Sequence, residues 1–470
     1  MGENRKYFFC GVGGSGMLPL AAILKARGAE VNGSDRSLDQ GRLAAKFDYL
    51  QDLGVGLFPQ DGSGLTSADQ VLVASAAIED AVPDVAAAKR IGAQRRTRAE
   101  TLADLFNGAE TGIGVAGTSG KSTTTAMIAW ILAEAGLDPT VMNGAVMKNF
   151  VSPDAPFASA RIGAGAPFVS EIDESDGSIA LFRPRIAVLN NIAHDHKTMD
   201  ELRRLFGEFV GKSEVAVINL DHEETARFAD RRDGAALSYS IDGADADYVA
   251  TDIVLGPVSV DFLAHDRRNN ETAPVRLAMP GRHNVANALA AIAASVAAGA
   301  AFSDAANALG SFRGVKRRFD IVGDAGGVTV IDDFAHNPDK IAATLRAMKA
   351  FPGRILVLFQ PHGFGPLRTM RSGFVEAFAD GLGPDDRLWM PEPVYFGGTV
   401  DRSVSSADVV AEIADRGVRA SAAATREACR GPILAAASAG DRIIVMGARD
   451  DTLSEFAADL LQGLAARPQA

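Results

Sequence analysis

The stretch GIGVAGTSGKSTTT, residues 112–125, is the most informative part of this 470-residue sequence. Its first five residues, 112–116, predict a short buried β-strand, and the apolar residues that follow the stretch, from Met127 to Ile131, predict a helix. The glycines and the lysine therefore lie in a loop between a strand and a helix. Such a loop presents backbone N–H groups and a lysine to the phosphates of a nucleotide.

The loop GTSGKS at 117–122 is a shortened P-loop, because Val115 stands where an ordinary P-loop has its first glycine. Its main-chain N–H groups are expected to cradle phosphate oxygens, with Lys121 on the β- and γ-phosphates and Ser122 within reach of Mg²⁺. A chance GKS is common in proteins. The position between a strand and a helix favours nucleotide binding here.

Outward from this loop, short β-rich runs alternate with alanine- and leucine-rich helical patterns, which is typical of α/β domains with parallel sheets. Only 248–279 breaks the rhythm: its alternation of apolar and polar residues predicts a small antiparallel excursion, and a helix from about Asn284 follows. At roughly 100 to 200 residues per domain, the length suggests three domains, placed at 1–107, 108–312 and 313–470. The expected strands are 8–11, 71–75, 112–116, 186–190, 215–220, 328–332, 355–360 and 443–446.

Composition excludes several classes of function. A net charge of -12 argues against a nucleic-acid partner, which needs a concentrated basic surface. The two cysteines, Cys10 and Cys429, have no metal-like spacing, and no apolar signal segment opens the chain. The alanine-rich stretch 286–301 is shorter than the ~20 residues of a membrane span. We therefore expect a cytoplasmic protein without a membrane partner.

A second glycine loop, GVGGSG at 11–16, follows the first predicted strand and opens a predicted helix at 17–27. Its glycines allow a tight turn and a close approach to a diphosphate. Asp35 lies at the end of the next strand, about where a dinucleotide fold carries its ribose-binding acid. Taken alone, this pattern suggests NAD, so an NAD-dependent oxidoreductase is one alternative.

Two polar runs follow predicted strands of the central domain. The acidic run EIDESD, 171–176, offers the hard oxygen ligands that suit Mg²⁺ on phosphates. In the run NNIAHDH, 190–196, His196 is a candidate metal ligand or polar anchor, and His194 is interpreted as a surface residue. Further on, Asn284 and Asn287 are spaced to share one helix face and could bind an adenine edge, with His283 available to stack.

The third domain supplies KRRF at 316–319 and IDDFAHNP at 331–338. An arginine and an acid from one domain, brought against ATP held in another, would suit closure around a transferring phosphoryl group.

The ordered motifs GVGGSGM, GTSGKSTTT, EIDESD, NNIAHDH, PGRHNVANA, GVKRRF, IDDFAHNP and FQPH resemble those of the Mur ligases, within them the muramate:alanine branch. The resemblance extends from Gly11 to about His362. It implies a three-domain α/β fold: a Rossmann-like N-terminal domain that holds a UDP-sugar, a central P-loop-type ATPase domain, and a Rossmann-like C-terminal domain that admits the amine.

The resemblance also implies a reaction of peptidoglycan precursor synthesis. The carboxylate of UDP-N-acetylmuramate attacks the γ-phosphate of ATP to give an acyl phosphate, and the amine of an amino acid, L-alanine in this branch, displaces phosphate. Such chemistry needs positioning and charge neutralisation more than a protein nucleophile. ATP and Mg²⁺ are the implied cofactors.

Residue roles are carried over from the same motifs. The implied catalytic residues are Lys121, Glu174, His196, Arg318 and Asp333, and the implied metal ligands are Ser122, Glu174 and His196. The nucleotide site comprises Gly117, Thr118, Gly120, Lys121, Ser122, Thr123, His283, Asn284, Asn287, Arg318 and Asp333. The substrate side comprises Gly13, Gly14, Ser15, Asp35, Ser75 and Arg98 in the first domain, and His336, His362 and Arg368 in the third.

Departures from the branch concentrate where the amine is expected. Ser119 replaces the histidine of GTHGKT, and Phe334 and Asn337 replace the tyrosine and histidine of DDYAHHP. After FQPH the branch reads RYSRT or similar, whereas here Arg368 comes two positions late. GARD at 447–450 departs from GAGD. A paralogue that joins a different amino acid or a recycled peptide, or a non-catalytic binding protein, is therefore an alternative.

Overall fold

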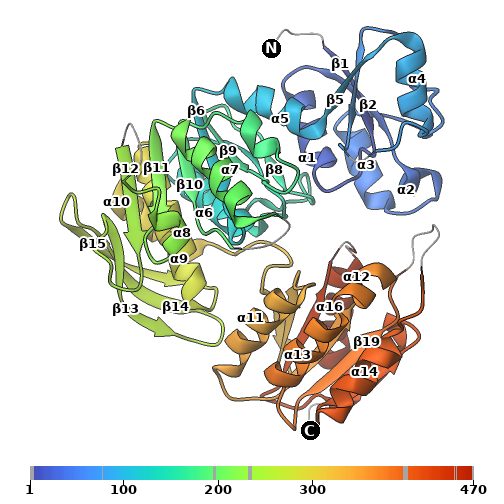
Figure 1. The fold of residues 1–470 in the computed structure, drawn as a ribbon, viewed down its shortest axis with the longest axis vertical. Coiled ribbons are helices and arrows are strands. Elements are labelled where there is room, and N and C mark those ends of the chain that lie inside the picture. The colour runs from blue at the N-terminus through green and yellow to red at the C-terminus, as the bar shows by residue number, and fades with distance from the viewer. Residues whose placement is uncertain are drawn as a thin grey trace. The chain divides into compact units, whose positions relative to one another are not determined.

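The computed structural model describes residues 5–76, 78–193, 197–230, 235–394, 401–448, 450 and 452–467. The chain divides into two compact units. The first comprises residues 1–254, 260–278 and 282–315, and the second comprises 255–259, 279–281 and 316–470. Figure 1 shows the three sheets that these units contain.

The N-terminal sheet is parallel, with five strands in the order β3-β2-β1-β4-β5. Successive residues of the central strand β1 point to opposite faces: Phe9 packs into one apolar cluster and Phe8 into another. Both faces are therefore covered, as a parallel sheet requires. The elements are β1 (Lys6–Cys10), α1 (Met17–Ala26), β2 (Glu30–Ser34), α2 (Arg36–Asp39), α3 (Ala44–Asp52), β3 (Gly56–Phe58), β4 (Gln70–Ala74), α4 (Pro83–Ile91), β5 (Gln94–Thr97) and α5 (Arg98–Asn107).

The central sheet has ten strands in the order β15-β14-β13-β12-β11-β10-β6-β9-β7-β8. Strand β6 pairs in parallel with β10 and β9, so the loops after these three strands meet at one edge. Its strands are β6 (Thr111–Ala116), β7 (Thr140–Met142), β8 (Ala160–Arg161), β9 (Pro167–Glu171), β10 (Ile186–Leu189), β11 (Val215–Asn219), β12 (Ala235–Ser240), β13 (Tyr248–Leu255), β14 (Val260–Asp266) and β15 (Glu271–Leu277).

Helices α6 and α9 pack against each other, and α7 contributes to a separate apolar cluster with the β10 side chains. Helix α6 is buried around most of its circumference: the small hydroxyl residues 122–125 follow its lysine, and alanine and large apolar residues follow those. The helical elements are α6 (Lys121–Glu134), η1 (Lys148–Phe150), η2 (Ser178–Leu181), α7 (Met199–Gly211), α8 (Glu223–Ala226), α9 (Arg282–Ala297), α10 (Phe302–Ala308) and η3 (Leu309–Ser311).

The C-terminal sheet has six strands in the order β16-β17-β21-β18-β19-β20, parallel except for the β16–β17 hairpin. Apolar clusters cover both of its faces. The elements are β16 (Asp320–Ala325), β17 (Val328–Asp333), α11 (Pro338–Lys349), β18 (Ile355–Gln360), α12 (Phe364–Thr369), α13 (Arg371–Gly381), β19 (Arg387–Pro391), α14 (Ser406–Asp415), β20 (Arg419–Ala423), α15 (Arg426–Ala436), β21 (Arg442–Gly447) and α16 (Thr452–Ala465).

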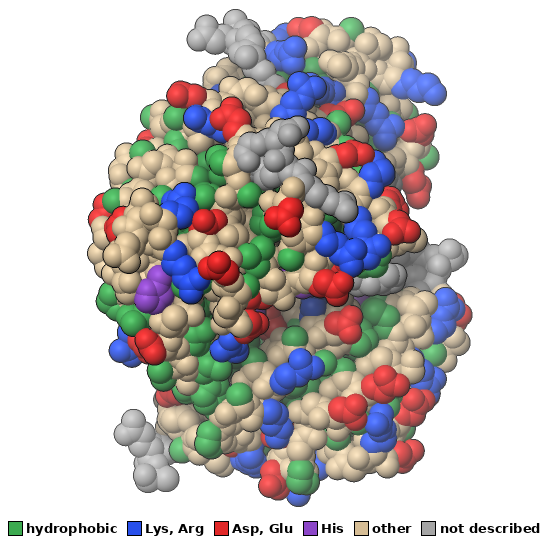
Figure 2. All heavy atoms as spheres, turned by 60° about the vertical axis from the view of Figure 1, so that its left-hand side comes forward, with side chains coloured by type: hydrophobic (Ala, Val, Ile, Leu, Met, Phe, Trp, Pro, Cys, Tyr) green, Lys and Arg blue, Asp and Glu red, His purple; other side chains and the backbone are tan. Residues whose placement is uncertain are grey.

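The predicted α/β class is confirmed, and each of the eight predicted strands is present within two residues of its expected ends. The excursion at 248–279 is confirmed as β13, β14 and β15, of which β14 and β15 are antiparallel. The division at 107/108 and 312/313 stays a prediction. Among the described residues, no helix is long and apolar enough to cross a membrane. On the face that Figure 2 presents, basic and acidic side chains are interspersed.

Candidate active site

The predicted P-loop connects β6 to α6 and depends on two glycines with left-handed backbone angles. Gly117 has φ of 135° and Gly120 has φ of 82°. A Cβ on Gly120 would lie 2.5 Å from Oδ1 of Asn287, so no other residue fits there without movement. The first intrahelical bond runs from Thr124 N to Gly120 O, at 2.9 Å. The N–H groups at the start of α6 are therefore free of intrahelical acceptors and can bind phosphate.

The outer part of the loop is held by the segment after β10. The N–H of Thr118 donates to the carbonyl of Asn191 at 3.1 Å, and the N–H of Ser119 donates to Oδ1 of Asn191 at 2.9 Å. The Thr118 hydroxyl exchanges hydrogen bonds with the backbone of Ala193. Thr118 therefore contacts protein, and the phosphate-binding part of the loop begins at Gly120.

Lys121 and Glu174 form a buried ion pair. The Nζ of Lys121 donates to Glu174 Oε2 and to the carbonyl of Gly117, both at 2.8 Å. The two side chains are only 12% and 9% exposed. The carboxylate of Glu174, predicted as a metal ligand, therefore holds the loop lysine in this structure.

The acid beside Ser122 is Glu171, which the sequence analysis did not single out. The hydroxyl of Ser122 donates to Glu171 Oε2 at 2.7 Å, and the N–H of Gly144 donates to the same oxygen at 3.0 Å. Glu171 is the last residue of β9 and is in register with Val115 of β6. A strand-end position next to the P-loop strand is the signal that could have distinguished it from Glu174.

Asp173 also lies in the acidic run. Burial alone would raise the pKa of its carboxyl, but the hydrogen bond from the N–H of Ser175 and the charges of Lys121 and Arg98 outweigh burial and lower the pKa. Asp173 is therefore a fixed negative charge. Among the described residues, no group of three or more His, Cys, Asp or Glu side chains could hold a metal ion. His194, Asp195 and His196 lie outside the described residues.

The predicted adenine-site residues occupy the first turns of α9. Asn284 and Asn287 lie on one face, and the Nδ2 of Asn287 donates to Asn284 Oδ1 at 3.3 Å. The Thr124 hydroxyl of α6 donates to Asn287 Oδ1 at 3.2 Å, so Asn287 braces the P-loop helix. Both are buried, whereas His283 is exposed. Thr123, within the first turn of α6, is buried.

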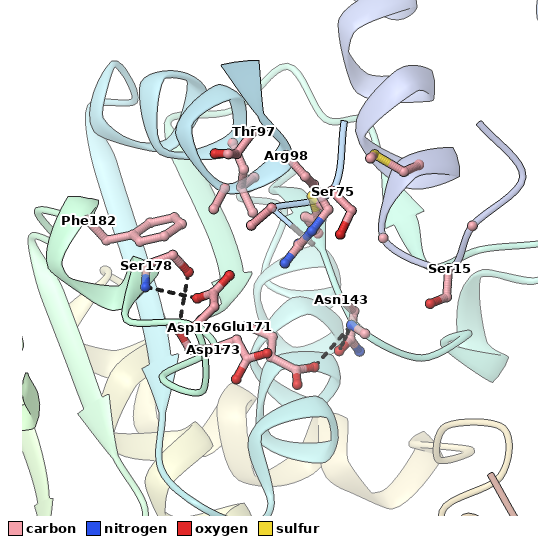
Figure 3. Close-up of a pocket in the computed structure, with 18 residues that line it drawn as sticks. Ser15, Ser75, Thr97, Arg98, Asn143, Glu171, Asp173, Asp176, Ser178 and Phe182 are labelled. Atoms are coloured by element: carbon pink, nitrogen blue, oxygen red, sulfur yellow. Dashed lines mark hydrogen bonds between the residues drawn. The ribbon is translucent and has the colours of Figure 1, made fainter. Parts of the chain in front are cut away.

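A cavity of about 520 Å³ opens between the N-terminal and central sheets (Figure 3). Arg98 extends into it from the start of α5, and Glu171 and Asp173 lie on the opposite wall. The predicted substrate residues Gly14, Ser15, Ser75 and Arg98 line this cavity, together with Thr97, Asn143, Glu171, Asp173, Asp176, Ser178 and Phe182. Glu171 therefore belongs both to the cavity and to the P-loop site.

Asp35 and Gly13, also predicted on the substrate side, are not among the residues that line the cavity. The N–H of Gly13 donates to Asp35 Oδ2 at 2.9 Å, and the N–H of Ser37 donates to Oδ1 at 2.8 Å. Asp35 thus anchors the glycine loop and caps α2. The Asp35 carboxylate therefore has a structural role at the glycine loop that requires no dinucleotide.

In the second unit, Arg318 and Asp333 are held by neighbours of their own domain. The guanidinium of Arg318 lies 4.9 Å from the ring centre of Phe334. Asp333 accepts from the N–H of Phe319 at 3.1 Å and from the hydroxyl of Thr344 at 2.6 Å. Both residues therefore have fixed positions at the carboxyl end of β17.

His336 and His362 lie together, with ring centres 5.2 Å apart. Burial lowers the pKa of His336 to about 4, and the charges of Lys340, His362 and Arg318 add to this effect. Its Nδ1 lies 2.8 Å from the carbonyl of Phe334. A carbonyl only accepts, so the neutral ring carries its proton on Nδ1 and a lone pair on Nε2. Arg368 forms an ion pair with Asp401.

Arg317, which the sequence analysis passed over for Arg318, is nearly buried and joins three segments. Its guanidinium donates to Gly447 O at 2.7 Å and to Asp450 O at 2.9 Å, and lies 3.4 Å from Asp332 Oδ1. Burial raises the pKa of Asp332 to about 6, although Arg317 and a hydrogen bond from Ser454 oppose this rise. Arg317 thus fixes the ends of β17 and β21.

Comparison with known proteins agrees with this architecture. Three family models match in order: "Mur ligase family, catalytic domain" over residues 6–110, "Mur ligase middle domain" over 115–295, and "Mur ligase, glutamate ligase domain" over 317–449. The UDP-N-acetylmuramate–L-alanine ligase of Geobacter sulfurreducens is 35% identical over 458 residues, which cover 95% of each chain. The chain belongs to the Mur ligase family.

Solved structures of other Mur ligases have the same fold. The UDP-N-acetylmuramate–alanine ligase of Thermotoga maritima matches with a TM-score of 0.79 and 25% identity, over 97% of this chain and 98% of that one. A murein peptide ligase of Psychrobacter arcticus matches with a TM-score of 0.71 and 25% identity, over 99% and 100%. The curated relative from Geobacter sp. (strain M21), also named as a UDP-N-acetylmuramate–L-alanine ligase, is 37% identical over 81% of each chain.

Proposed function

We propose that this Mur ligase joins L-alanine to the carboxylate of UDP-N-acetylmuramate at the expense of ATP, a step of peptidoglycan precursor synthesis. The proposal is supported by the names of its relatives, which include one that is 35% identical over 95% of each chain. The observation that carries the proposal is that Glu171 belongs to both sites: it lines the cavity, and its Oε2 lies 2.7 Å from the hydroxyl of the P-loop residue Ser122. An acid in that cavity would meet the terminal phosphate of a nucleotide on the loop.

The reaction proceeds in two displacements. An oxygen of the substrate carboxylate attacks the γ-phosphorus of ATP, the bond to the bridging oxygen breaks, and ADP leaves. The amine nitrogen then attacks the acyl carbon, the C–N bond forms, inorganic phosphate leaves, and the amine loses its proton. Lys121, released from Glu174 by the incoming phosphates, neutralises charge on the transferring group.

The residues beside the loop fit a magnesium ion. The Ser122 hydroxyl and the Glu171 carboxylate are hard oxygen ligands, 2.7 Å apart at the end of β9. Two protein oxygens, with the remaining ligands from phosphate and water, suit Mg²⁺ better than a closed protein cage. When bound, the ion supplies charge neutralisation on the phosphates. We assign the carboxylate ligand to Glu171 in place of Glu174.

On the amine side, the neutral ring of His336 offers Nε2 as a hydrogen-bond acceptor. The family motifs assign Arg318 and Asp333 to the ATP phosphates. ATP as the energy source fits the cytoplasm, where we place the enzyme. The departures around Arg368, which pairs with Asp401, make a peptide the competing amine class. One solved relative is named for such a peptide, L-alanyl-γ-D-glutamyl-meso-diaminopimelate.

Parallel assays decide between these amines. The enzyme, ATP, Mg²⁺ and UDP-N-acetylmuramate are incubated separately with each of the twenty amino acids and with an L-alanyl-γ-D-glutamyl peptide, and phosphate release is measured. Release with L-alanine is expected. Release only with another amino acid or with the peptide would overturn the assignment of the amine. Lys121→Ala should abolish phosphate release in either case, and unchanged release would remove the P-loop from the mechanism.

A further inference from the structure

The P-loop of this chain has one side-chain bond of its own, from Lys121 Nζ to the carbonyl of Gly117, and is otherwise held from outside. Because Val115 is a buried residue of β6, the strand continues through the position where ordinary P-loops begin to turn, and only 117–120 remain as loop. Such a short loop has few groups with which to brace its own backbone. The outside bracing comes from the segment that follows β10.

Asn191, two residues after the end of β10, uses both of its side-chain groups and its carbonyl on the loop. Its Oδ1 accepts from the N–H of Ser119 at 2.9 Å, and its Nδ2 donates to the carbonyl of Ser119 at 3.1 Å. Its carbonyl accepts from the N–H of Thr118 at 3.1 Å. Asn191 therefore pairs with the loop much as a strand residue pairs with a neighbouring strand.

The backbone approach is close enough to require glycine in the loop. A Cβ on Gly117 would lie 3.0 Å from the carbonyl oxygen of Asn191 and 3.1 Å from its nitrogen. Gly117 also has φ of 135°, which other residues rarely adopt. The glycine and the asparagine thus form one clasp, in which Gly117 permits the contact and Asn191 makes it.

The clasp divides the loop N–H groups into two sets. Those of Thr118 and Ser119 are satisfied by Asn191, and those at the start of α6 remain directed toward a ligand. A loop fixed before the ligand arrives loses less conformational entropy on binding. We propose that Asn191 is a positioning residue that pre-forms the phosphate-binding loop for ATP. The inference rests on the proposed use of ATP.

The amide is chemically specific for this position. Aspartate would keep an acceptor for the N–H of Ser119, but it would lose the donor to the Ser119 carbonyl. It would also place a negative charge beside the phosphate site. Asn191→Ala therefore removes the clasp alone. Asn191→Asp weakens the clasp and also adds electrostatic repulsion between its carboxylate and the phosphates.

The chain offers a matched control in Asn149. Its Nδ2 donates to the carbonyl of Ser311 at 2.9 Å, and its Oδ1 accepts from the N–H of Arg313 at 2.7 Å. This is the same kind of two-bond clasp on a backbone segment, and Asn149 does not line the cavity. Asn149→Ala therefore removes two side-chain hydrogen bonds of the same kind, and neither of them is to the P-loop.

The test measures ATP dissociation constants by calorimetry, together with KM for ATP and for UDP-N-acetylmuramate and the melting temperature. Because Asn191→Ala removes two side-chain hydrogen bonds to the loop, it should weaken ATP binding by roughly tenfold or more. Its KM for UDP-N-acetylmuramate should stay within about twofold of the wild-type value. Asn191→Asp should bind ATP more weakly still, and added salt should narrow the gap between the two variants because the repulsion is screened.

Asn149→Ala should lower the melting temperature to a similar extent and leave ATP binding unchanged. The inference is overturned if Asn191→Ala and Asn191→Asp bind ATP like the wild type, or if Asn149→Ala weakens ATP binding equally. A wild-type enzyme that binds no ATP would instead refute the proposed function. Because binding is measured without turnover, the two failures are distinguishable even if the amine assignment is wrong.

Discussion

The hydroxyl of Ser122 lies 2.7 Å from Oε2 of Glu171, so the first turn of α6 meets the last residue of β9. The neighbouring acid Glu174 is instead paired with Lys121 at 2.8 Å. Two acids three positions apart thus face two different groups of the loop. One faces the serine that would bind a metal, and the other faces the lysine that would bind phosphate.

This division predicts different metal dependence for two isosteric variants. Glu171→Gln removes the charged ligand, so the Mg²⁺ concentration for half-maximal activity should rise by about tenfold, the scale of a lost charge-assisted contact. Glu174→Gln should leave that concentration within about twofold. Titrating Mg²⁺ at saturating ATP measures both. A larger shift for Glu174→Gln would restore Glu174 as the metal ligand.

Gly120→Ala should cost both stability and ATP turnover. The new Cβ would meet Asn287 Oδ1 at 2.5 Å, and φ of 82° is unfavourable for alanine. Backbone strain costs about 1 kcal/mol and the steric clash adds to it. Gly136→Ala, beyond the other end of α6, is the matched control, because its φ is 73° and its Cβ would meet nothing within 4 Å. Urea unfolding of both variants isolates the clash, and equal losses would contradict the geometry.

His336 predicts a pH dependence of stability. Its folded pKa of about 4 lies below the ordinary histidine pKa of 6.5, so the unfolded chain binds its proton first as pH falls. The folded state therefore loses stability between about pH 6.5 and 4. Asp332 has the opposite effect. Burial raises its pKa to about 6, so its contribution to the free energy of unfolding falls as pH rises.

The variant His336→Asn separates the two groups, since its amide can still donate to the Phe334 carbonyl. The difference in melting temperature between wild type and variant should move in favour of the variant as pH falls from 6.5 to 4. Melting curves at half-unit steps of pH test this, and a constant difference would show that the His336 ring titrates normally.

Asp35→Ala should weaken the binding of UDP-N-acetylmuramate in the cavity and leave the binding of ATP unchanged. Without the acceptor for the N–H of Gly13, the glycine loop is less firmly held, and KM for UDP-N-acetylmuramate should rise several-fold, about the scale of one hydrogen bond. Asp39→Ala is a suitable comparison, because Asp39 accepts one backbone N–H, from Gln60 at 3.1 Å, outside the loop. Equal effects of the two variants on that KM would argue against the anchoring role.

Much of the fold was predictable because it rests on local patterns. Each parallel strand appears as a short apolar run, and the excursion at β13 to β15 appears as alternation. The strand–loop–helix context of 112–131 was sufficient to place the P-loop. The spacing of Asn284 and Asn287 correctly predicted that they share one face of a helix.

The residues that were missed depend on long-range pairing. Nothing local in EIDESD says which acid faces the P-loop, because that follows from the register of β9 with β6. Asn191 reaches Ser119 only because β10 pairs with β6. Arg317 and Arg318 are adjacent and chemically identical in the sequence. Both guanidinium groups lie near the Phe334 ring, 5.1 and 4.9 Å from its centre, and only the turn of the chain between them buries Arg317 and leaves Arg318 half-buried.

The buried guanidinium of Arg317 has a consequence for how amine preference can change. It binds the carbonyls at 447 and 450, lies beside Asp332, and stands next to the arginine that we place on ATP. Gly447, Asp450 and the end of β17 are therefore held together by one side chain. A segment exchanged from another ligase at one of these contacts would therefore displace Arg317, and with it the other segments that Arg317 binds. Amine preference in this enzyme should be transplanted as a linked set of segments, with Arg317 kept.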